Sequence, residues 1–298
     1  MMRILLFGAN GQVGRETAAL AAARGVDLVG VDRARADIAD PVAVARLFAE
    51  VAPTLAINAA AYTAVDRAES EPEAATRGNA TGPGVLAERC ARLGVPLIHI
   101  STDYVFDGTK AGAYVEADPI APLGVYGRTK AAGEAAVRAA GERHVILRTS
   151  WVYGVHGANF LKTMLRLAGE RDRLTIVADQ RGCPTATRDI AEALLAVARQ
   201  MEAGTARFGT YHFAGSGVTT WHGFARAIIS AAARHTGRTP EVAAITTADY
   251  PTPARRPANS ELDSSLFERT FRYRAAPWET RVREIVDALL APQPVETP

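Results

Sequence analysis

Short apolar runs alternate with longer helix-forming stretches along the first half of the chain. This alternation is typical of buried parallel strands connected by helices that cross back over the sheet. It predicts an α/β fold with a doubly wound parallel sheet, covered by helices on both faces. The expected strands are Arg3–Phe7, Asp27–Val31, Thr54–Asn58, Pro96–Ser101 and His144–Thr149. The expected helices are Glu16–Arg24, Pro41–Val51, Gly82–Leu93 and Tyr126–Ala140.

The pattern changes after residue 150, where strands become shorter and irregular stretches longer. A proline-rich, irregular segment runs from Ile245 to Ser260. Loops of this kind, held beyond a rigid sheet, commonly form a binding pocket. We therefore expect a second, smaller domain in residues 151–298, with a frayed end at Pro292–Pro298. Its expected elements are the helices Asn159–Ala168, Thr187–Arg199 and Trp221–His235 and the strands Leu174–Val177 and Thr210–Phe213.

A glycine-rich segment, Gly8–Gly14, joins the first expected strand to the first expected helix. Glycines three apart permit a tight turn and let backbone amides approach a pyrophosphate at the helix N-terminus. Asp32 ends the next expected strand, where a carboxylate favours the adenine ribose of NAD. Arg33 and Arg35 follow, and either could pair with the 2′-phosphate of NADP or lie in a solvated loop. The segment predicts a Rossmann-like dinucleotide-binding domain over residues 1–150, with returning segments at about 174–215, and leaves NADPH or NADH open.

Tyr126 and Lys130 lie four residues apart at the start of an expected helix, so their side chains share one face. A nearby ammonium lowers the pKa of a phenol, which suits Tyr126 to give a proton to a developing alkoxide. Such a pair is often only a surface pair, but Lys130 is one of three lysines in the chain. Thr102, or Ser101 beside it, follows the carboxyl end of a strand and could donate to a substrate carbonyl or cap the strand. We favour Thr102.

Composition excludes several classes of protein. The chain has 298 residues, a net charge of +2 and 22% charged residues, which argues against a nucleic-acid partner. No apolar run is long enough to span a membrane, and the apolar start is too short for a signal peptide. Cys90 and Cys183 have no paired spacing, which argues against a disulfide scaffold and fits a cytoplasmic protein. The six histidines do not cluster, and His99 and His212 are expected to be packed within strands.

Several segments together carry a resemblance to a known family. They are Leu5–Gly14, Asn58–Asp66, Ala68–Glu73, Ser101–Gly108, Tyr126–Lys130, Arg148–Tyr153 and Tyr250–Pro257. With them the chain resembles the extended short-chain dehydrogenase/reductase family and, more closely, its dTDP-4-dehydrorhamnose reductases. The resemblance covers nearly the whole chain. It implies a smaller C-terminal substrate-binding domain, with the substrate between the domains. It also implies NAD(P)H-dependent reduction of the 4-keto group of dTDP-4-dehydro-6-deoxy-L-mannose to dTDP-L-rhamnose.

The resemblance also assigns roles to individual residues. It implies that Thr102, Tyr126 and Lys130 are catalytic. The residues expected to approach the dTDP-linked 4-ketosugar are Thr63, Val65, Thr102, Asp103, Tyr104, Trp151 and Arg256. Those expected to bind the cofactor are Gly8, Asn10, Gly11, Gln12, Val13, Gly14, Asp32, Arg33, Asp37, Ile38, Ala59, Ala60, Ala61, Tyr126 and Lys130. Trp151 could be a lid over the sugar or could pack between the domains.

One departure concerns magnesium. Some family members form dimers through a magnesium site built from glutamates, and Glu16 matches one such position. Arg188 replaces a later one, and an arginine cannot ligate magnesium. We therefore expect no metal site, and a monomer or weak homodimer. By itself, the acidic stretch Asp66, Glu69, Glu71 and Glu73 would indicate a solvated helix face.

Two alternative functions remain open. The first is reduction of a related nucleotide 4-ketosugar, which pocket residues would decide. The second is a non-catalytic, NADP-binding regulatory subunit, whose expected signature is loss of the tyrosine–lysine pair. Tyr126 and Lys130 are both present, which favours an enzyme.

Overall fold

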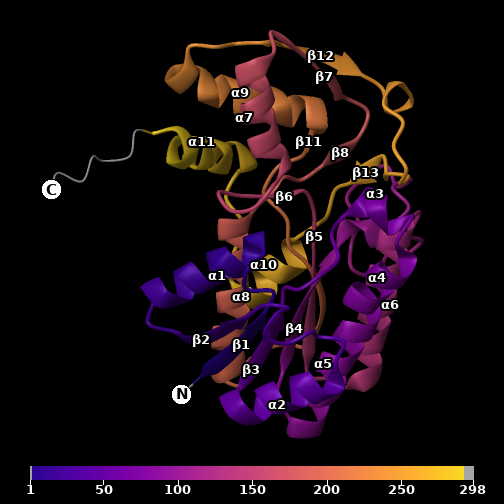
Figure 1. Ribbon diagram of the computed structural model, residues 1–298, viewed down its shortest axis with the longest axis vertical. Helices are drawn as coiled ribbons and strands as arrows, with labels where there is room; N and C mark the ends of the chain where they lie inside the picture. The colour runs from indigo at the N-terminus through magenta and orange to yellow at the C-terminus, as the bar shows by residue number, and fades with distance from the viewer. Residues whose placement is uncertain (1, 292–298) are drawn as a thin grey trace, which may run out of the picture.

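A six-stranded parallel sheet forms the centre of the protein (Figure 1). The computed structural model describes residues 2–291, so the frayed end expected at Pro292–Pro298 lies outside the described residues. The strand order is β10-β5-β4-β3-β1-β2, and every neighbouring pair is parallel. The predicted doubly wound α/β fold is thereby confirmed. The strands are β1 (Arg3–Phe7), β2 (Asp27–Val31), β3 (Leu55–Asn58), β4 (Leu97–Thr102), β5 (His144–Thr149) and β10 (Gly209–His212).

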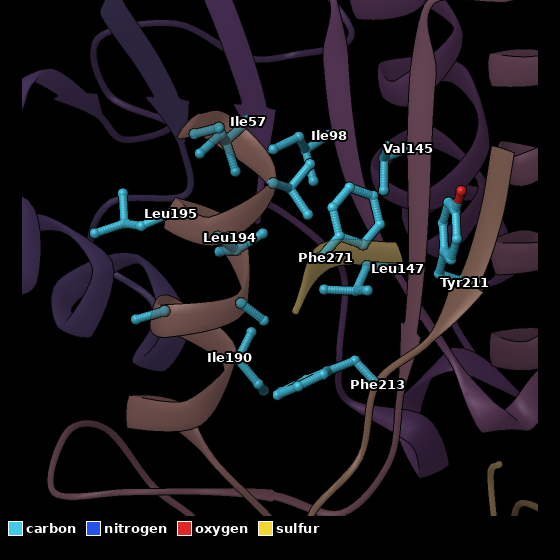
Figure 2. Close-up of a cluster of buried hydrophobic side chains, with 14 of the residues drawn as sticks. Ile57, Ile98, Val145, Leu147, Ile190, Leu194, Leu195, Tyr211, Phe213 and Phe271 are labelled. Carbon is cyan, nitrogen blue, oxygen red and sulfur yellow. The ribbon is translucent and has the colours of Figure 1, made fainter. Parts of the chain in front are cut away.

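Helices cover both faces of this sheet. One face packs against α1 (Gln12–Ala23), α8 (Thr187–Glu202) and α10 (Ser265–Phe271). Figure 2 shows this core, in which Ile190 of α8 lies beside Phe213 and Leu194 of the same helix faces the strands. The other face packs against α2 (Pro41–Val51), α5 (Gly82–Leu93) and α6 (Val125–Ala140). Burying each large apolar side chain stabilises the fold by roughly 1.5–3 kcal/mol, so the two cores hold the strand ends in fixed positions.

A separate core lies beyond the sheet, in the upper part of Figure 1. It is formed by α7 (Phe160–Glu170), α9 (Trp221–Thr236) and α11 (Trp278–Leu290). Beside these helices, β7 (Arg173–Val177) pairs in parallel with β12 (Glu241–Ile245). Thus the strand expected at Leu174–Val177 belongs to this small sheet, and the chain returns to the main sheet through α8 and β10.

Short elements connect the two parts. These elements are strands of two residues each. β6 (Val152–Tyr153) pairs with β9 (Thr185–Ala186). β8 (Arg181–Gly182) pairs with β11 (Thr219–Thr220) and β13 (Asn259–Ser260). The remaining turns are η2 (Asp103–Val105) and η3 (Thr247–Asp249). Within residues 2–291, no helix combines the length and the apolar character needed to cross a bilayer.

Several stretches differ from expectation. α1 begins at Gln12 rather than Glu16, because Gly11 is its N-cap and the glycine turn runs directly into the helix. The helices α10 and α11 are not among the predicted elements. Between β3 and α5 the apolar pattern gives no helix bounds, but the structure has α3 (Val65–Ala68), α4 (Pro72–Thr76) and the π-helix η1 (Arg77–Thr81). These turns are too short to show a helical period of apolar residues.

Candidate active site

The glycine turn after β1 is shaped by close backbone contacts. Gly8 has φ +81°, and a Cβ there would lie 2.6 Å from the backbone nitrogen of Ala60. A Cβ at Gly14 would lie 2.1 Å from the carbonyl oxygen of Gly8. Any side chain at either position would therefore collide with the backbone of the turn or of the loop after β3. These observations fit a phosphate-binding turn, and they place Ala59 and Ala60 at its side.

Polar side chains surround the end of β2 next to this turn. Asp32 accepts a hydrogen bond from Asn10 Nδ2 at 2.6 Å and one from the backbone nitrogen of Arg35 at 3.1 Å. The side chain of Arg33 is 84% exposed and lies 3.7 Å from a carboxylate oxygen of Asp37. Asp32 can therefore accept from ribose hydroxyls, while the exposed guanidinium of Arg33 is free to meet a 2′-phosphate.

Asp37 and Ile38 follow this region in the chain and are held by contacts with neighbouring segments. Asp37 accepts from the backbone nitrogen of Ala39 at 3.0 Å and from Arg77 of η1 at 3.1 Å. Partial burial alone would raise the pKa of Asp37, but these donors hold it below its ordinary value. Ile38 is buried against Gly82 at the start of α5.

The far end of the glycine turn faces the α7 side of the protein. Gln12 Oε1 accepts a hydrogen bond from Asn159 Nδ2 at 2.9 Å, and Asn159 caps α7 by accepting from the backbone nitrogen of Lys162. Val13 packs against the core between α1 and α8. The first turn of α1 is therefore fixed by both parts of the protein. Ala61, in the loop after β3, is exposed at the same sheet edge.

Thr102 and Tyr126 meet at the carboxyl end of β4. Thr102 Oγ1 donates to Asp103 Oδ1 at 3.0 Å and accepts from the backbone nitrogen of Tyr104 at 3.2 Å. The ring of Tyr104 packs edge-on against that of Tyr126, with centroids 5.4 Å apart. Burial raises the pKa of Tyr126 to about 12, whereas its hydrogen bond with Thr102 lowers it and the charge of Asp103 raises it. Tyr126 is thus a protonated phenol at neutral pH, in contact with Thr102.

Lys130 lies one turn further along α6 and is 2% exposed. Its ammonium donates to the carbonyl oxygen of Ile100 at 2.7 Å. Burial lowers the pKa of Lys130 to about 8, and the charge of Glu134 opposes that effect. The expectation that Lys130 lowers the pKa of Tyr126 is wrong for this structure, because burial of the phenol outweighs any effect of the ammonium.

Asp103 is 3% exposed beside this pair. Burial raises the pKa of Asp103 to about 6, and hydrogen bonds from Ser260 and Thr102 oppose the rise. Oδ2 of Asp103 has no hydrogen-bond partner among the described residues, so this oxygen is available to a ligand hydroxyl. The sequence pattern gives no sign of Ser260, which reaches the site from β13.

Arg256 holds the proline-rich segment against α3. Its guanidinium pairs with Asp66 through contacts of 2.8 and 3.1 Å, and the backbone nitrogen of Ala254 donates to the same carboxylate at 3.2 Å. A cavity of about 700 Å³ adjoins it. The lining of this cavity includes Phe160, Arg171, Arg173, Trp221, Tyr250 and Arg256, a mixture of aromatic and cationic groups that suits a base and a diphosphate.

Trp151 connects the end of β5 to the second core. It has φ +47°, a left-handed conformation that is uncommon for a bulky residue. Its ring stacks on Trp221 with centroids 3.6 Å apart, and Phe160 contacts the same Trp221 ring at 4.7 Å. The structure therefore favours packing between the two parts over a free lid.

The acidic stretch after β3 is not a solvated helix face, and that expectation is wrong. Glu69 accepts from the backbone nitrogen of Val125 at 2.8 Å and so anchors the start of α6. Glu71 accepts from the hydroxyl of Tyr62 at 2.6 Å, and Asp66 pairs with Arg256. Three of the four acidic side chains position neighbouring segments. The other predicted residues of this region are Thr63, which is exposed, and Val65, which is half-buried.

The remaining expectations concern metal and histidine. Glu16 accepts from the hydroxyl of Thr187 at 3.2 Å, and Arg188 lies 3.5 Å from Glu192. No group of three or more His, Cys, Asp or Glu side chains within the described chain is arranged to hold a metal ion. His99 and His212 are fully buried within strands, as predicted.

Comparison with known proteins agrees with this geometry. A family model described as RmlD substrate binding domain matches residues 2–291. A dTDP-4-dehydrorhamnose reductase of Sinorhizobium fredii is 47% identical, with 97% of this chain and 98% of the relative covered. The chain belongs to the dTDP-4-dehydrorhamnose reductase family. It is therefore an oxidoreductase of the short-chain dehydrogenase/reductase type.

Solved structures give the same result. A dTDP-4-dehydrorhamnose reductase from Clostridium acetobutylicum is 38% identical with a TM-score of 0.89, covering 97% of this chain and 99% of that one. The enzyme from Bacillus anthracis, solved in complex with NADP, is 33% identical with a TM-score of 0.89, covering 96% and 99%.

Proposed function

We propose that this reductase transfers a hydride from NAD(P)H to the 4-keto carbon of dTDP-4-dehydro-6-deoxy-L-mannose, giving dTDP-L-rhamnose. This is the reaction for which the similar proteins described above, the dTDP-4-dehydrorhamnose reductases, are named. The observation that carries the proposal is the placement of Thr102, at the carboxyl end of β4, next to Tyr126 at the start of α6, with Lys130 one turn further along that helix. In open parallel sheets this edge is where ligands bind.

The residues of the glycine turn fit a nicotinamide dinucleotide. The absence of a Cβ at Gly8 and Gly14 lets the backbone pack closely enough to form this turn directly before α1, whose N-terminus would face the pyrophosphate. When bound, NAD(P)H supplies the hydride, which is the part of the chemistry that side chains cannot supply. Asp32 and Arg33 would hold the adenosine end, and Lys130 would hold the nicotinamide ribose in place of its contact with Ile100.

Tyr126 would deliver the proton to the developing alkoxide. Its high pKa keeps the phenol protonated at neutral pH, so the proton is present when negative charge appears on the sugar oxygen. Thr102 donates to Asp103 in the structure, and its hydroxyl is positioned to orient the Tyr126 hydroxyl and the sugar oxygen. The chain thus contributes orientation and electrostatic stabilisation.

The substrate would extend from this contact toward the second core. We propose that Thr63, Val65, Asp103, Tyr104 and Trp151 contact the sugar or nucleotide and that Arg256 contacts the diphosphate. The cavity beside Arg256 supports this direction. In this scheme residues 1–150, with returning segments, bind the cofactor, and the rest of the chain mostly binds the substrate. We further propose a cytoplasmic monomer or weak homodimer, with two free, buried cysteines.

The test is oxidation of NADPH and of NADH with enzymatically prepared dTDP-4-dehydro-L-rhamnose, followed by nicotinamide absorbance, with the product identified by NMR. Formation of dTDP-L-rhamnose is expected. Formation of the 4-epimer, dTDP-6-deoxy-L-talose, would retain the mechanism and change the product. Tight NADPH binding without oxidation would favour a different 4-ketosugar or the regulatory alternative.

The proton donor is tested by replacing Tyr126 with Phe. We expect kcat to fall by about 10²–10⁴-fold while the Kd for NADPH changes little, since only the transferred proton is lost. Tyr211→Phe on β10 is the control, because it removes a phenol hydroxyl that donates to the backbone of Arg207, away from the site. Near-normal turnover of the Tyr126 variant would refute the assignment.

A further inference from the structure

A line of polar side chains continues along α6 beyond the catalytic pair. Tyr126, Lys130, Glu134 and Arg138 are each four residues apart, so they follow one face of the helix. Glu134 is fully buried beneath Lys130, whereas Arg138 reaches the surface. A buried carboxylate needs strong partners, so its position next to the catalytic lysine requires an explanation.

Arg148 on β5 fixes this carboxylate. Its Nε donates to one oxygen of Glu134 at 2.8 Å and its Nη2 to the other at 2.7 Å, a bidentate arrangement. Nη1 of Arg148 faces His212 Nε2 at 3.4 Å, and the guanidinium lies over the ring of Phe106. With both oxygens held, the carboxylate of Glu134 cannot turn away from α6.

The clamp lies against the strand that holds Lys130. Arg148 is the register partner of Ser101 on β4. Lys130 donates to Ile100, the residue that precedes Ser101 on the same strand. Thus the carboxylate is fastened to β5 through Arg148, and the ammonium is fastened to the neighbouring strand β4.

The other titratable groups around Lys130 do not offset the lowering of its pKa by burial. His99 of β4 is neutral, because burial and the charge of Lys130 lower its pKa well below the ordinary value. Tyr126 is protonated, and Arg148 and Arg138 are cations. The negative charge that opposes the desolvation of Lys130 is that of Glu134.

We propose that Glu134, clamped by Arg148, is a positioning residue that keeps Lys130 in its ammonium form for the nicotinamide ribose. The inference rests on the role proposed above for Lys130. It assigns a part in the reaction to a buried ion pair that touches neither the cofactor nor the sugar.

A purely structural role for the pair makes a different prediction. If Glu134 only ties α6 to β5, its loss lowers stability and lowers activity equally at every pH. If it holds the charge of Lys130, its loss also lowers the pKa of Lys130. The alkaline fall in cofactor affinity then moves to lower pH, because an uncharged amine binds the ribose less well.

The experiment measures the Kd for NADPH, by fluorescence, and kcat/KM from about pH 6 to about pH 9, which report the free enzyme. For Glu134→Gln we expect the alkaline limb to move down by about one pH unit, which is about a tenfold weaker binding above the limb. Glu134→Asp keeps the charge, so the pH of its alkaline limb should return toward that of the unaltered protein.

A second variant protects the test against loss of folding. Glu134→Gln leaves Arg148 buried without its partner, whereas Glu134→Gln with Arg148→Met removes both charges and is expected to fold. The control is Asp189→Asn, since Asp189 is also 1% exposed and paired with an arginine, Arg281, away from Lys130. The Asp189→Asn variant should lower the melting temperature without moving the alkaline limb of the pH profile.

Folded Glu134 variants with the unaltered pH profile would overturn the proposal. So would failure of the double variant to fold, because the carboxylate would then be needed for structure itself. The NADPH measurement does not use the sugar, so an inactive wild-type protein would refute the proposed reaction and leave this inference open to its own test.

Discussion

Replacing Asp103 with Asn makes the most quantitative prediction for this structure. Asp103 is 3% exposed, and one of its oxygens has no partner among the described residues. Burial raises the pKa of Asp103 from 3.8 to about 6. The ionised carboxylate is therefore less stable in the folded chain than in the unfolded chain, and a neutral amide of the same shape removes that cost.

The sign and size follow from linkage. Below pH 3.8 the carboxyl group is protonated in both states and costs nothing, whereas between pH 3.8 and about pH 6 the cost grows. Above about pH 6 it levels off at about 3 kcal/mol, because each unit of pKa difference corresponds to about 1.4 kcal/mol. The effect of Asp103→Asn on the free energy of unfolding should become more favourable by that amount between acid and neutral pH.

Urea denaturation of both proteins at several values from about pH 4 to about pH 8 measures this difference. Any fixed penalty from the new amide group cancels, because only the change with pH is compared. Asp107→Asn is the control: hydrogen bonds from the backbone nitrogen of Thr109 and from Tyr114 lower the pKa of Asp107. Its substitution should have nearly the same effect across this range, because a lowered carboxyl pKa changes stability mainly below pH 3.8. A flat difference for Asp103→Asn, or one of the opposite sign, would refute the reasoning.

Two further predictions concern the cofactor. Gly8→Ala should weaken NADPH binding at least about tenfold, measured by titration calorimetry, since its Cβ would lie 2.6 Å from the nitrogen of Ala60 and φ is positive. Gly25→Ala is the control, with φ +65° and no neighbour within 4 Å, so it should affect stability but not binding. Asp32→Ser should raise the NADPH-to-NADH ratio of kcat/KM about tenfold, because it removes the ribose acceptor and leaves Arg33; an unchanged ratio would show that Asp32 does not face the ribose.

Much of the central sheet is readable in the sequence because its strands are continuous apolar runs. Leu97–Thr102 and His144–Thr149 each follow a helix with a clear stop signal, Gly94 after α5 and Gly141 after α6. The glycine turn and the tyrosine–lysine pair have fixed local spacings, so they could also be recognised before the fold was known. Their roles remain predictions.

Contacts between distant segments could not be predicted in this way. Ser260 reaches Asp103, and Glu69 caps the start of α6 across 56 residues of sequence. Neither pair has a local signature, because each depends on how β13 and α3 are placed by the completed fold. The pKa of Tyr126 was predicted in the wrong direction for the same reason: spacing shows the neighbour Lys130 but not the depth of burial.

The stacked indoles of Trp151 and Trp221 make the junction between the two parts of the protein optically distinctive. They are two of the three tryptophans, and their rings lie nearly parallel, 10° apart. Transition dipoles this close couple, so the pair should give a strong near-ultraviolet circular dichroism signal of its own. Tryptophan emission also overlaps the absorption of reduced nicotinamide, and Trp221 lines the cavity beside Arg256. The enzyme thus carries an intrinsic spectroscopic reporter of ligand binding near this junction, which requires no added label.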